Sequence, residues 1–289
     1  MVVLFISSLS EYLTTSTMSQ MLIDDSSSEA MLNIIFSIEF PKVPCDLIYM
    51  DSRDLIGFTA EDLQKNITRS KMTNGVTQTK DKWVRNPSIS YEEVKRMIES
   101  YEGCYITGST MVNKVPGNVH FSMHNEKLIG IIQKLSSEGI VVNFAHKIKH
   151  FSFGSHSRQA KEIQKKYPEI ELFPLQETSM SEDIRLAIAY QYYLNVVRTV
   201  VELRGKPVEV YQYTISKSFG LTRDMPALFF KYEMSPLYVR YEIKQKSIWH
   251  FIVNICAIIG GVYTAFSILD AIIYSSVSKI FKNRIGKLS

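Results

Sequence analysis

The chain has 289 residues, of which 45% are hydrophobic and 21% are charged, so it holds enough apolar material for one large domain or two ordinary ones and is not intrinsically disordered. Its formal net charge of +4 is local, because residues 275–289 contain four basic residues and no acid. A nucleic-acid binder would spread its basic side chains over a folded face, whereas this excess follows a hydrophobic segment, so nucleic acid is not an expected partner.

The N-terminal segment begins with an apolar run, Val2–Ile6, that is too short to span a bilayer by itself. Serines and Glu11 interrupt it. A secretory signal peptide would need a basic region ahead of this run, and none is present. The run is therefore interpreted as the end of a membrane segment.

Three cysteines, Cys45, Cys104 and Cys256, lie too far apart in sequence for a CxxC redox motif or a zinc pair. Cys256 falls within a later apolar run and is interpreted as a small lipid-facing or helix-packing residue. Cys45 and Cys104 are a candidate disulfide if the domain is luminal, although they can equally be two buried thiols. Asn66 begins a glycosylation sequon, which is consistent with a luminal face but also arises by chance.

Three short helices are predicted in the middle of the chain. Ser90 and Glu93 have capping-box spacing, and apolar residues at positions i, i+3, i+4 and i+7 follow them. The same periodicity recurs over Leu128–Leu135, and the polar stretch Ser157–Lys166 is a third candidate. We expect these helices to be accessories to a β core.

The longer apolar stretches predict strands. Tyr190–Leu203, Pro207–Ile215 and Ala227–Ile243 are rich in Val, Tyr and Phe and are separated by turn signals. We therefore expect residues 16–248 to form a mainly β domain, an antiparallel β-sandwich with a few short helices.

The histidines His146, His150 and His156 cluster in sequence, so a metal site is conceivable. No cysteine lies near them, and ordinary surface or hydrogen-bonding histidines are the favoured interpretation. We expect no metal, no cofactor and no catalytic site, and the protein is not predicted to be an enzyme.

A transmembrane helix is predicted at residues 249–274. Phe251–Leu269 carries no charge, Asp270 is the single acid near its end, and Trp249 and Tyr274 suit the two interfaces. The alternative is a buried core helix. The basic residues that follow the helix favour a cytosolic tail at residues 275–289.

Ala257, Gly261 and Ala265 repeat at four-residue spacing within this helix. Small side chains on one helix face let another helix approach closely, so this is a candidate helix-association face. The alternative is that Gly and Ala are simply common in membrane helices.

Long, distinctive strings run along the whole chain. They are EYLTT (11–15), FSIEFPKVPCDLIYMDSRD (36–54), GCYITGSTMVNKVPGNVHFS (103–122), HKIKHFSFG (146–154), YQYYLNVVRTVVE (190–202), VYQYTIS (210–216), MPALFFKYEMSPLYVRYE (225–242) and NICAIIGGVYTAFSILDAIIY (254–274). Together they resemble the ERGIC/Erv family of endoplasmic reticulum vesicle proteins, which cycle through the ER-Golgi intermediate compartment. The second string resembles the strand with the family's FPxxPC element, to which Cys45 belongs, and the third its GCxxxGxxxVNKVxGNxH string.

The resemblance implies a two-span protein with both ends in the cytosol and a luminal β-sandwich. It implies travel in coated vesicles between the endoplasmic reticulum, the intermediate compartment and the Golgi membrane. Family members act in hetero-oligomeric pairs as cargo receptors and are not enzymes. The implied partners are thus the membrane, a family partner chain, vesicle coat proteins and luminal cargo proteins.

Two departures from the family pattern concern the N-terminus and the cysteines. The opening segment is too short to span, so residues 1–15 are interpreted as the remnant of a truncated first transmembrane helix. The additional cysteine-rich segment of one branch and the thioredoxin insertion with CxxC of some relatives do not appear in the sequence.

The tail matches the family only in part. Ile280 and Phe281 are a candidate coat-binding pair of the kind that family tails use for export, and the alternative is that the membrane helix simply continues past Tyr274. Lys287 stands where a dilysine retrieval signal needs one lysine, but the positions that would hold the other are Gly286 and Ile285.

The expected function is that of a trafficking receptor that binds luminal cargo or a family partner and couples it to vesicle coats. A structural partner in a membrane complex is one alternative. A membrane-anchored luminal folding or redox helper is another, and the lack of CxxC argues against it.

Overall fold

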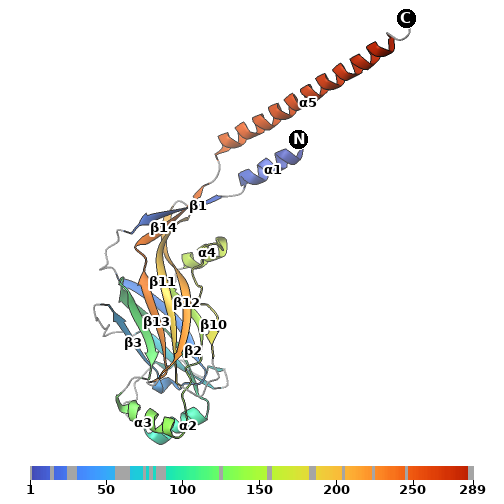
Figure 1. Ribbon diagram of the computed structural model, residues 1–289. Helices are drawn as coiled ribbons and strands as arrows, with labels where there is room; N and C mark the ends of the chain where they lie inside the picture. Colours follow the sequence, from blue (N-terminus) through green and yellow to red (C-terminus); the bar gives the residue numbers. More distant parts are fainter. Residues whose placement is uncertain are drawn as a thin grey trace. The chain divides into compact units, whose positions relative to one another are not determined.

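The computed structural model describes residues 2–13, 16–24, 31–55, 66–73, 76–77, 81–82, 89–123, 126–154, 158–181, 187–203, 206–222, 225–244 and 247–285. The chain divides into two compact units. One comprises Met1–Ser19 and Tyr241–Ser289, and the other comprises Gln20–Arg240. The larger unit is built of two β-sheets, which confirms the expected mainly β class (Figure 1).

The first sheet has seven strands in the order β1-β14-β11-β13-β8-β3, and β12 also pairs with β11. Its strands are β1 Ser16–Ile23, β3 Tyr49–Asp54, β8 Gly117–Ser122, β11 Ile188–Leu203, β12 Lys206–Leu221, β13 Ala227–Met234 and β14 Leu237–Lys244. β11 and β12 form a hairpin paired from Ile188↔Leu221 to Leu203↔Lys206.

The second sheet also has seven strands, in the order β10-β9-β2-β7-β4-β5, with β6 paired to β4. Its strands are β2 Met31–Phe40, β4 Ile67–Thr73, β5 Val76–Thr77, β6 Asp81–Lys82, β7 Gly103–Asn113, β9 His146–Phe153 and β10 Thr178–Met180. The register between β2 and β9 shifts between Ser37 and Ile38, which marks a β-bulge.

The pairing of β11 with β13 departs from the antiparallel expectation. β11 and β13 run parallel, with Ala189 opposite Ala227. The reason is topological: β12 returns to the start of β11, and the chain then crosses to the other edge of β11 before β13 begins. β13 therefore runs in the same direction as β11.

The core lies between the two sheets, whose inward-facing side chains alternate along each strand. On β2 the alternate residues from Leu32 to Phe40 are buried. The ring of Phe36 meets that of Phe121 in the other sheet at 5.4 Å, and Phe151 stacks on Phe230 at 4.5 Å. Each such buried side chain contributes roughly 1.5–3 kcal/mol relative to exposure.

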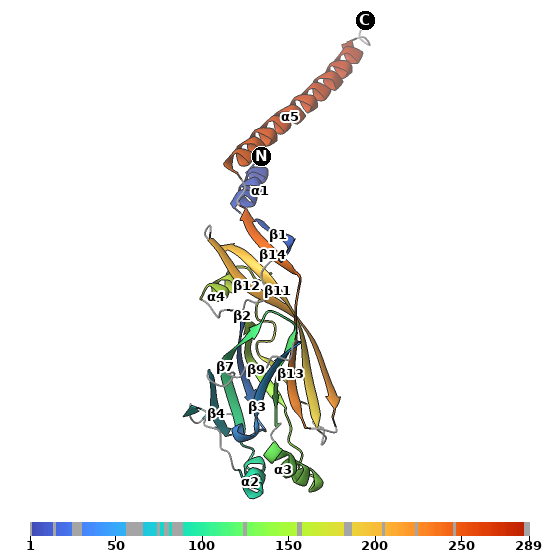
Figure 2. The ribbon, with the colours of Figure 1, turned by 90° about the vertical axis from the view of Figure 1, so that its left-hand side faces the viewer.

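Short helices decorate the sandwich, as predicted. They are α2 Tyr91–Glu99, α3 Glu126–Ser137, α4 Arg158–Lys166 and the 3-10 turn η1 Cys45–Leu47. The capping box is confirmed, because the Ser90 hydroxyl accepts from the Glu93 amide at 3.3 Å and the Ser90 amide donates to the Glu93 carboxylate at 3.0 Å. α2 and α3 lie side by side at one end of the sandwich in both views (Figures 1 and 2).

The smaller unit contains two helices, α1 Val2–Leu13 and α5 Ile248–Ile285. Within α5, the segment Ile248–Ser275 is long and apolar enough to span a bilayer, and its apolar stretch is not buried inside the protein. A soluble core helix of this composition would be buried, so the alternative of a core helix is not favoured. The prediction of a C-terminal apolar helix is confirmed.

Candidate functional site

The two helices of the smaller unit contact each other. The Asn254 side-chain amide donates a hydrogen bond to the Ser8 hydroxyl at 3.2 Å, and the rings of Tyr12 and Phe251 lie 4.7 Å apart. The earlier residue of α1, Ser8, contacts the later residue of α5, and Tyr12 contacts the earlier one, so the two helices run antiparallel. In an apolar surrounding, a side-chain hydrogen bond of this kind holds helices together.

The predicted helix-association face is exposed. Ala257, Gly261 and Ala265 are all solvent-accessible, and a Cβ atom built on Gly261 would meet no atom within 4 Å. Within the described residues, therefore, no helix lies against Gly261. That this face receives a partner helix stays a prediction.

Cys45 and Cys104 are brought together by the fold. Cys45 opens the 3-10 turn η1 and Cys104 lies in β7, and the structure joins them at an S–S distance of 2.01 Å. Both residues are buried. Next to Cys104, the backbone at Gly103 packs closely against the end of β2, because a Cβ at Gly103 would lie 2.8 Å from the carbonyl oxygen of Phe40. The bridge itself stays a prediction for the protein in its compartment.

Arg69 of β4 forms hydrogen bonds to the backbone of the same turn. Its guanidinium donates to the carbonyl oxygens of Cys45 and Ile48, and the side chain is buried. Burial lowers the pKa of Arg69 to about 10, so the group is still charged at neutral pH. Nothing in the sequence marks Arg69, because an isolated arginine in a strand carries no signal of its burial.

The remaining predicted site residues lie on the surface or at the helix end. Asn66 is exposed directly before β4. Ile280 and Phe281 fall within α5, which continues to Ile285, so the backbone of this pair is helical. Glycosylation of Asn66 and coat binding by the pair both stay predictions.

Of the three histidines that cluster in sequence, the structure describes His146 and His150, which have different hydrogen-bond partners. His146 is buried, with its Nδ1 2.9 Å from the Phe144 carbonyl oxygen and its Nε2 2.8 Å from the Tyr192 hydroxyl. His150 pairs with the Ser152 hydroxyl at 2.9 Å. His156 lies outside the described residues. In the part of the chain that the structure describes, no three His, Cys, Asp or Glu side chains are placed to hold a metal ion.

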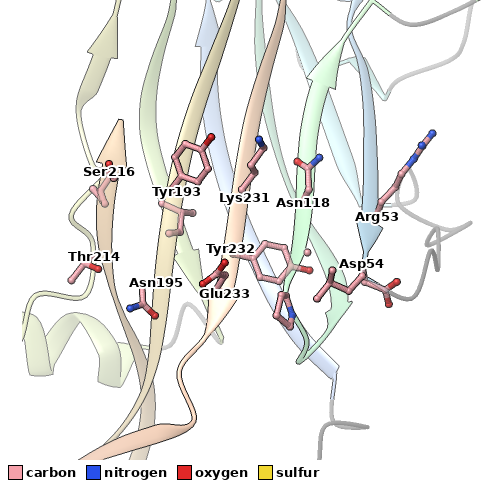
Figure 3. Close-up of a pocket in the computed structure, with 15 residues that line it drawn as sticks. Arg53, Asp54, Asn118, Tyr193, Asn195, Thr214, Ser216, Lys231, Tyr232 and Glu233 are labelled. Atoms are coloured by element: carbon pink, nitrogen blue, oxygen red, sulfur yellow. The ribbon is translucent and has the colours of Figure 1, made fainter. Parts of the chain in front are cut away.

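A groove on the outer face of the first sheet was not predicted. It has a volume of about 590 Å³ and is lined by residues of β3, β8, β11, β12 and β13 and the segments next to them (Figure 3). No motif in the sequence of any one strand marks these residues as a binding surface. Only the pairing register aligns them into one surface.

Contacts between side chains order this groove. The Tyr193 hydroxyl donates to the Gln191 side-chain oxygen at 2.6 Å, and the Lys231 ammonium donates to the same oxygen at 3.0 Å. The ammonium also lies 5.1 Å from the centroid of the Tyr193 ring. Farther along the face, the His120 ring stacks on Phe229 at 5.3 Å. The groove therefore presents the Tyr193 ring beside fixed polar groups, and the His120–Phe229 pair continues the same face.

Comparison with known protein families agrees with this architecture. Residues 71–270 match the model described as "Endoplasmic reticulum vesicle transporter", and residues 1–60 match that of the "Endoplasmic Reticulum-Golgi Intermediate Compartment (ERGIC)". The chain belongs to the endoplasmic reticulum vesicle transporter family. It is thus a membrane protein of ER-Golgi traffic, located in the membranes of the endoplasmic reticulum, the intermediate compartment and the Golgi.

Individual relatives support the assignment to this family. Over 297 residues the chain is 27% identical to "Endoplasmic reticulum-Golgi intermediate compartment protein 1" of Danio rerio, a match that covers 100% of the chain and 88% of the relative. The crystal structure of Erv41p superposes with a TM-score of 0.54 and 24% identity, covering 77% of this chain and 99% of that one, and so shares the fold.

A third relative bears on the redox alternative. "Protein disulfide-isomerase 5-4" of Arabidopsis thaliana is 33% identical over 193 residues, which covers 64% of this chain but only 39% of the relative. The shared part is therefore less than half of that protein.

Proposed function

We propose that this vesicle transporter is a cargo receptor, or one subunit of a hetero-oligomeric cargo receptor, cycling between the endoplasmic reticulum and the Golgi. The observation that carries the proposal is the groove of about 590 Å³ on the β-sandwich of a chain that also has a membrane helix. A receptor needs a surface for cargo and a connection to the coat, and clefts of this volume are typical of binding sites.

The proposed topology places the sandwich, residues 16–248, in the lumen and residues 275–289 in the cytosol. The basic residues of the tail favour this orientation, because positive charge is retained on the cytosolic side. Ile280 and Phe281 are the proposed contact with the vesicle coat, presented on the end of α5.

The cysteines argue against a redox helper and for a chain that is not an enzyme. Cys45 and Cys104 are buried at 5% and 0% exposure, whereas a disulfide that exchanges with a substrate must be accessible to an attacking thiolate. The third cysteine, Cys256, lies in the membrane-spanning window of α5.

A vesicle budding assay tests the proposal. In vesicles formed from ER membranes, we expect the wild-type chain to be enriched, and a chain with Ile280→Ala and Phe281→Ala to be depleted. Val277→Ala, an apolar change one turn earlier on the same helix, is the matched control. We also expect luminal proteins to be cross-linked to the chain and to be missorted when it is removed.

Two outcomes would contradict the receptor role. If the wild-type chain were excluded from the vesicles, it could not accompany cargo, and the receptor role would be wrong. Normal sorting of all luminal proteins in its absence, with a family partner chain destabilised, would leave only the structural-partner function.

A further inference from the structure

The groove is crossed by a single row of side chains, one from each of five neighbouring strands. Ser216 of β12 lies opposite Tyr193 of β11, which lies opposite Lys231 of β13. Lys231 in turn lies opposite Asn118 of β8, and Asn118 opposite Arg53 of β3. Figure 3 shows these side chains along one face of the sheet. Since neighbouring strands lie about 4.8 Å apart, the row is about 19 Å long.

The two flanking rows add polar groups on one side and both polar and aromatic groups on the other. A shift of two residues along the strands in one direction leads to the row formed by Thr214, Asn195 and Glu233. A shift of two residues in the other direction leads to the row formed by Gln191, Phe229 and His120. The face thus carries amide, hydroxyl and charged groups around the exposed ring of Tyr193, which has 43% of its surface accessible.

This mixture suits a ligand with hydroxyl groups on its rim and C–H groups on its faces. Amide side chains both donate and accept hydrogen bonds, as sugar hydroxyls do. Aromatic rings offer a flat apolar surface against which the C–H face of a sugar ring can pack. Gln191 and Lys231 hold Tyr193 in place before a ligand arrives, which lowers the entropy that binding must offset.

The balance of charged side chains around the groove favours a neutral ligand. On this face of the sheet, Arg53 and Lys231 are cationic and Asp51 and Glu233 are anionic, so their formal charges cancel, and Arg53 pairs with Asp51 at 3.1 Å. A site built for an acidic or basic peptide would carry an excess of the opposite charge.

From these features we propose that the groove binds a neutral oligosaccharide. Arg53 and Asn118 also line a second cavity, of about 750 Å³, that runs on toward α3, so the surface is long enough for several linked sugars rather than one. Which molecule carries this oligosaccharide rests on the proposed function. In a cargo receptor, the oligosaccharide belongs to a luminal glycoprotein.

The test uses the full chain in nanodiscs without glycoside detergent, because a sugar headgroup would compete for the site. The probe is a free oligomannose N-glycan, titrated calorimetrically. We expect saturable binding, a loss of affinity of at least about fivefold for Tyr193→Ala, and a change below about twofold for Tyr193→Phe, which keeps the ring. Asn195→Ala should also weaken binding.

Phe219→Ala is the matched control. Phe219 is an exposed aromatic residue of the same sheet, with 46% of its surface accessible, but it pairs with the buried Tyr190 and so belongs to the opposite face. We expect it to bind the glycan as wild type does. Circular dichroism of each variant checks that the sandwich is folded.

Three results would overturn the glycan site. They are no binding by the folded wild-type chain at millimolar glycan, equal binding by wild type and folded Tyr193→Ala, and displacement of the glycan by an unglycosylated peptide that binds more tightly. Each of these leaves the receptor role intact if the budding and sorting tests succeed. Conversely, glycan binding by a chain that fails those tests supports the site and overturns only the receptor role.

Discussion

His146 is a buried residue whose ionisation state depends on the fold. It lies among the rings of Phe40, Tyr190 and Tyr192, and its two ring nitrogens face the Phe144 carbonyl and the Tyr192 hydroxyl. Burial disfavours the charged imidazolium and lowers the pKa of His146 from 6.5 to about 4.

This depressed pKa predicts a pH-dependent stability. As the pH falls below about 6.5, the unfolded chain binds a proton that the folded chain does not, so the free energy of unfolding decreases until the pH reaches the folded pKa of about 4. The slope is about 1.4 kcal/mol per pH unit, or roughly 3 kcal/mol over the whole window.

The measurement is the urea midpoint of the wild type and of His146→Gln at pH 7, 6 and 5. The urea midpoint of the variant should fall less steeply as the pH decreases, because the variant lacks the histidine. Carboxylates contribute equally to the pH dependence of both proteins. Parallel slopes for the two proteins would show that His146 does not titrate as proposed.

Cys45 and Cys104 give a second residue-scale prediction. In denatured, non-reduced protein we expect a thiol reagent to label Cys256 alone, and to label all three cysteines after reduction. A bridge closing 59 residues of chain should contribute about 4 kcal/mol by the chain-entropy estimate. Cys45→Ala with Cys104→Ala should therefore lower stability, whereas Cys256→Ser should not; free alkylation of Cys45 and Cys104 before reduction would contradict the bridge.

At the scale of elements, a substitution in α5 can test whether Ala257, Gly261 and Ala265 form a helix-association face or reflect only the usual composition of membrane helices. Gly261→Leu should leave membrane insertion intact, because Leu is more favourable than Gly in a bilayer, but its bulk should keep a partner helix away. The measurement is detergent co-purification of a tagged chain with its family partner.

Ile259→Leu is the control for this change, because Ile259 lies on the same helix, is half exposed, and faces elsewhere. If Gly261→Leu retains the partner as well as wild type and this control do, the stripe is compositional and association resides in the sandwich.

At the scale of the whole molecule, orientation in the membrane is the central prediction. A protease added to sealed microsomes should remove a tag from the C-terminal tail and leave the sandwich protected, because the tail is cytosolic in the proposed topology. Protection of the tag would reverse the orientation.

Glycosylation at Asn66 checks the same orientation independently. Only luminal sequons are modified, and Asn66 is exposed directly before β4. We expect a glycosidase-sensitive mass shift that Asn66→Gln abolishes. A shift that persists in this variant would assign the modification to another residue.

The sequence by itself determined the features that depend on neighbouring residues. The apolar length of α5, the capping box at Ser90 and the strands at Tyr190–Leu203 are encoded by local spacing, and the structure confirms all three. Local periodicity suffices for these because a helix or strand exposes each of its faces at a fixed repeat.

Only the tertiary structure decided what depends on pairing between distant segments. The parallel arrangement of β11 and β13, the meeting of Cys45 with Cys104, and the row from Tyr193 to Arg53 all follow from strand order and register. A shift of one residue in register would turn Tyr193 toward the core, and nothing in the local pattern of β13 or β8 specifies its partner. The groove exists because long-range packing of the core selects one register among many.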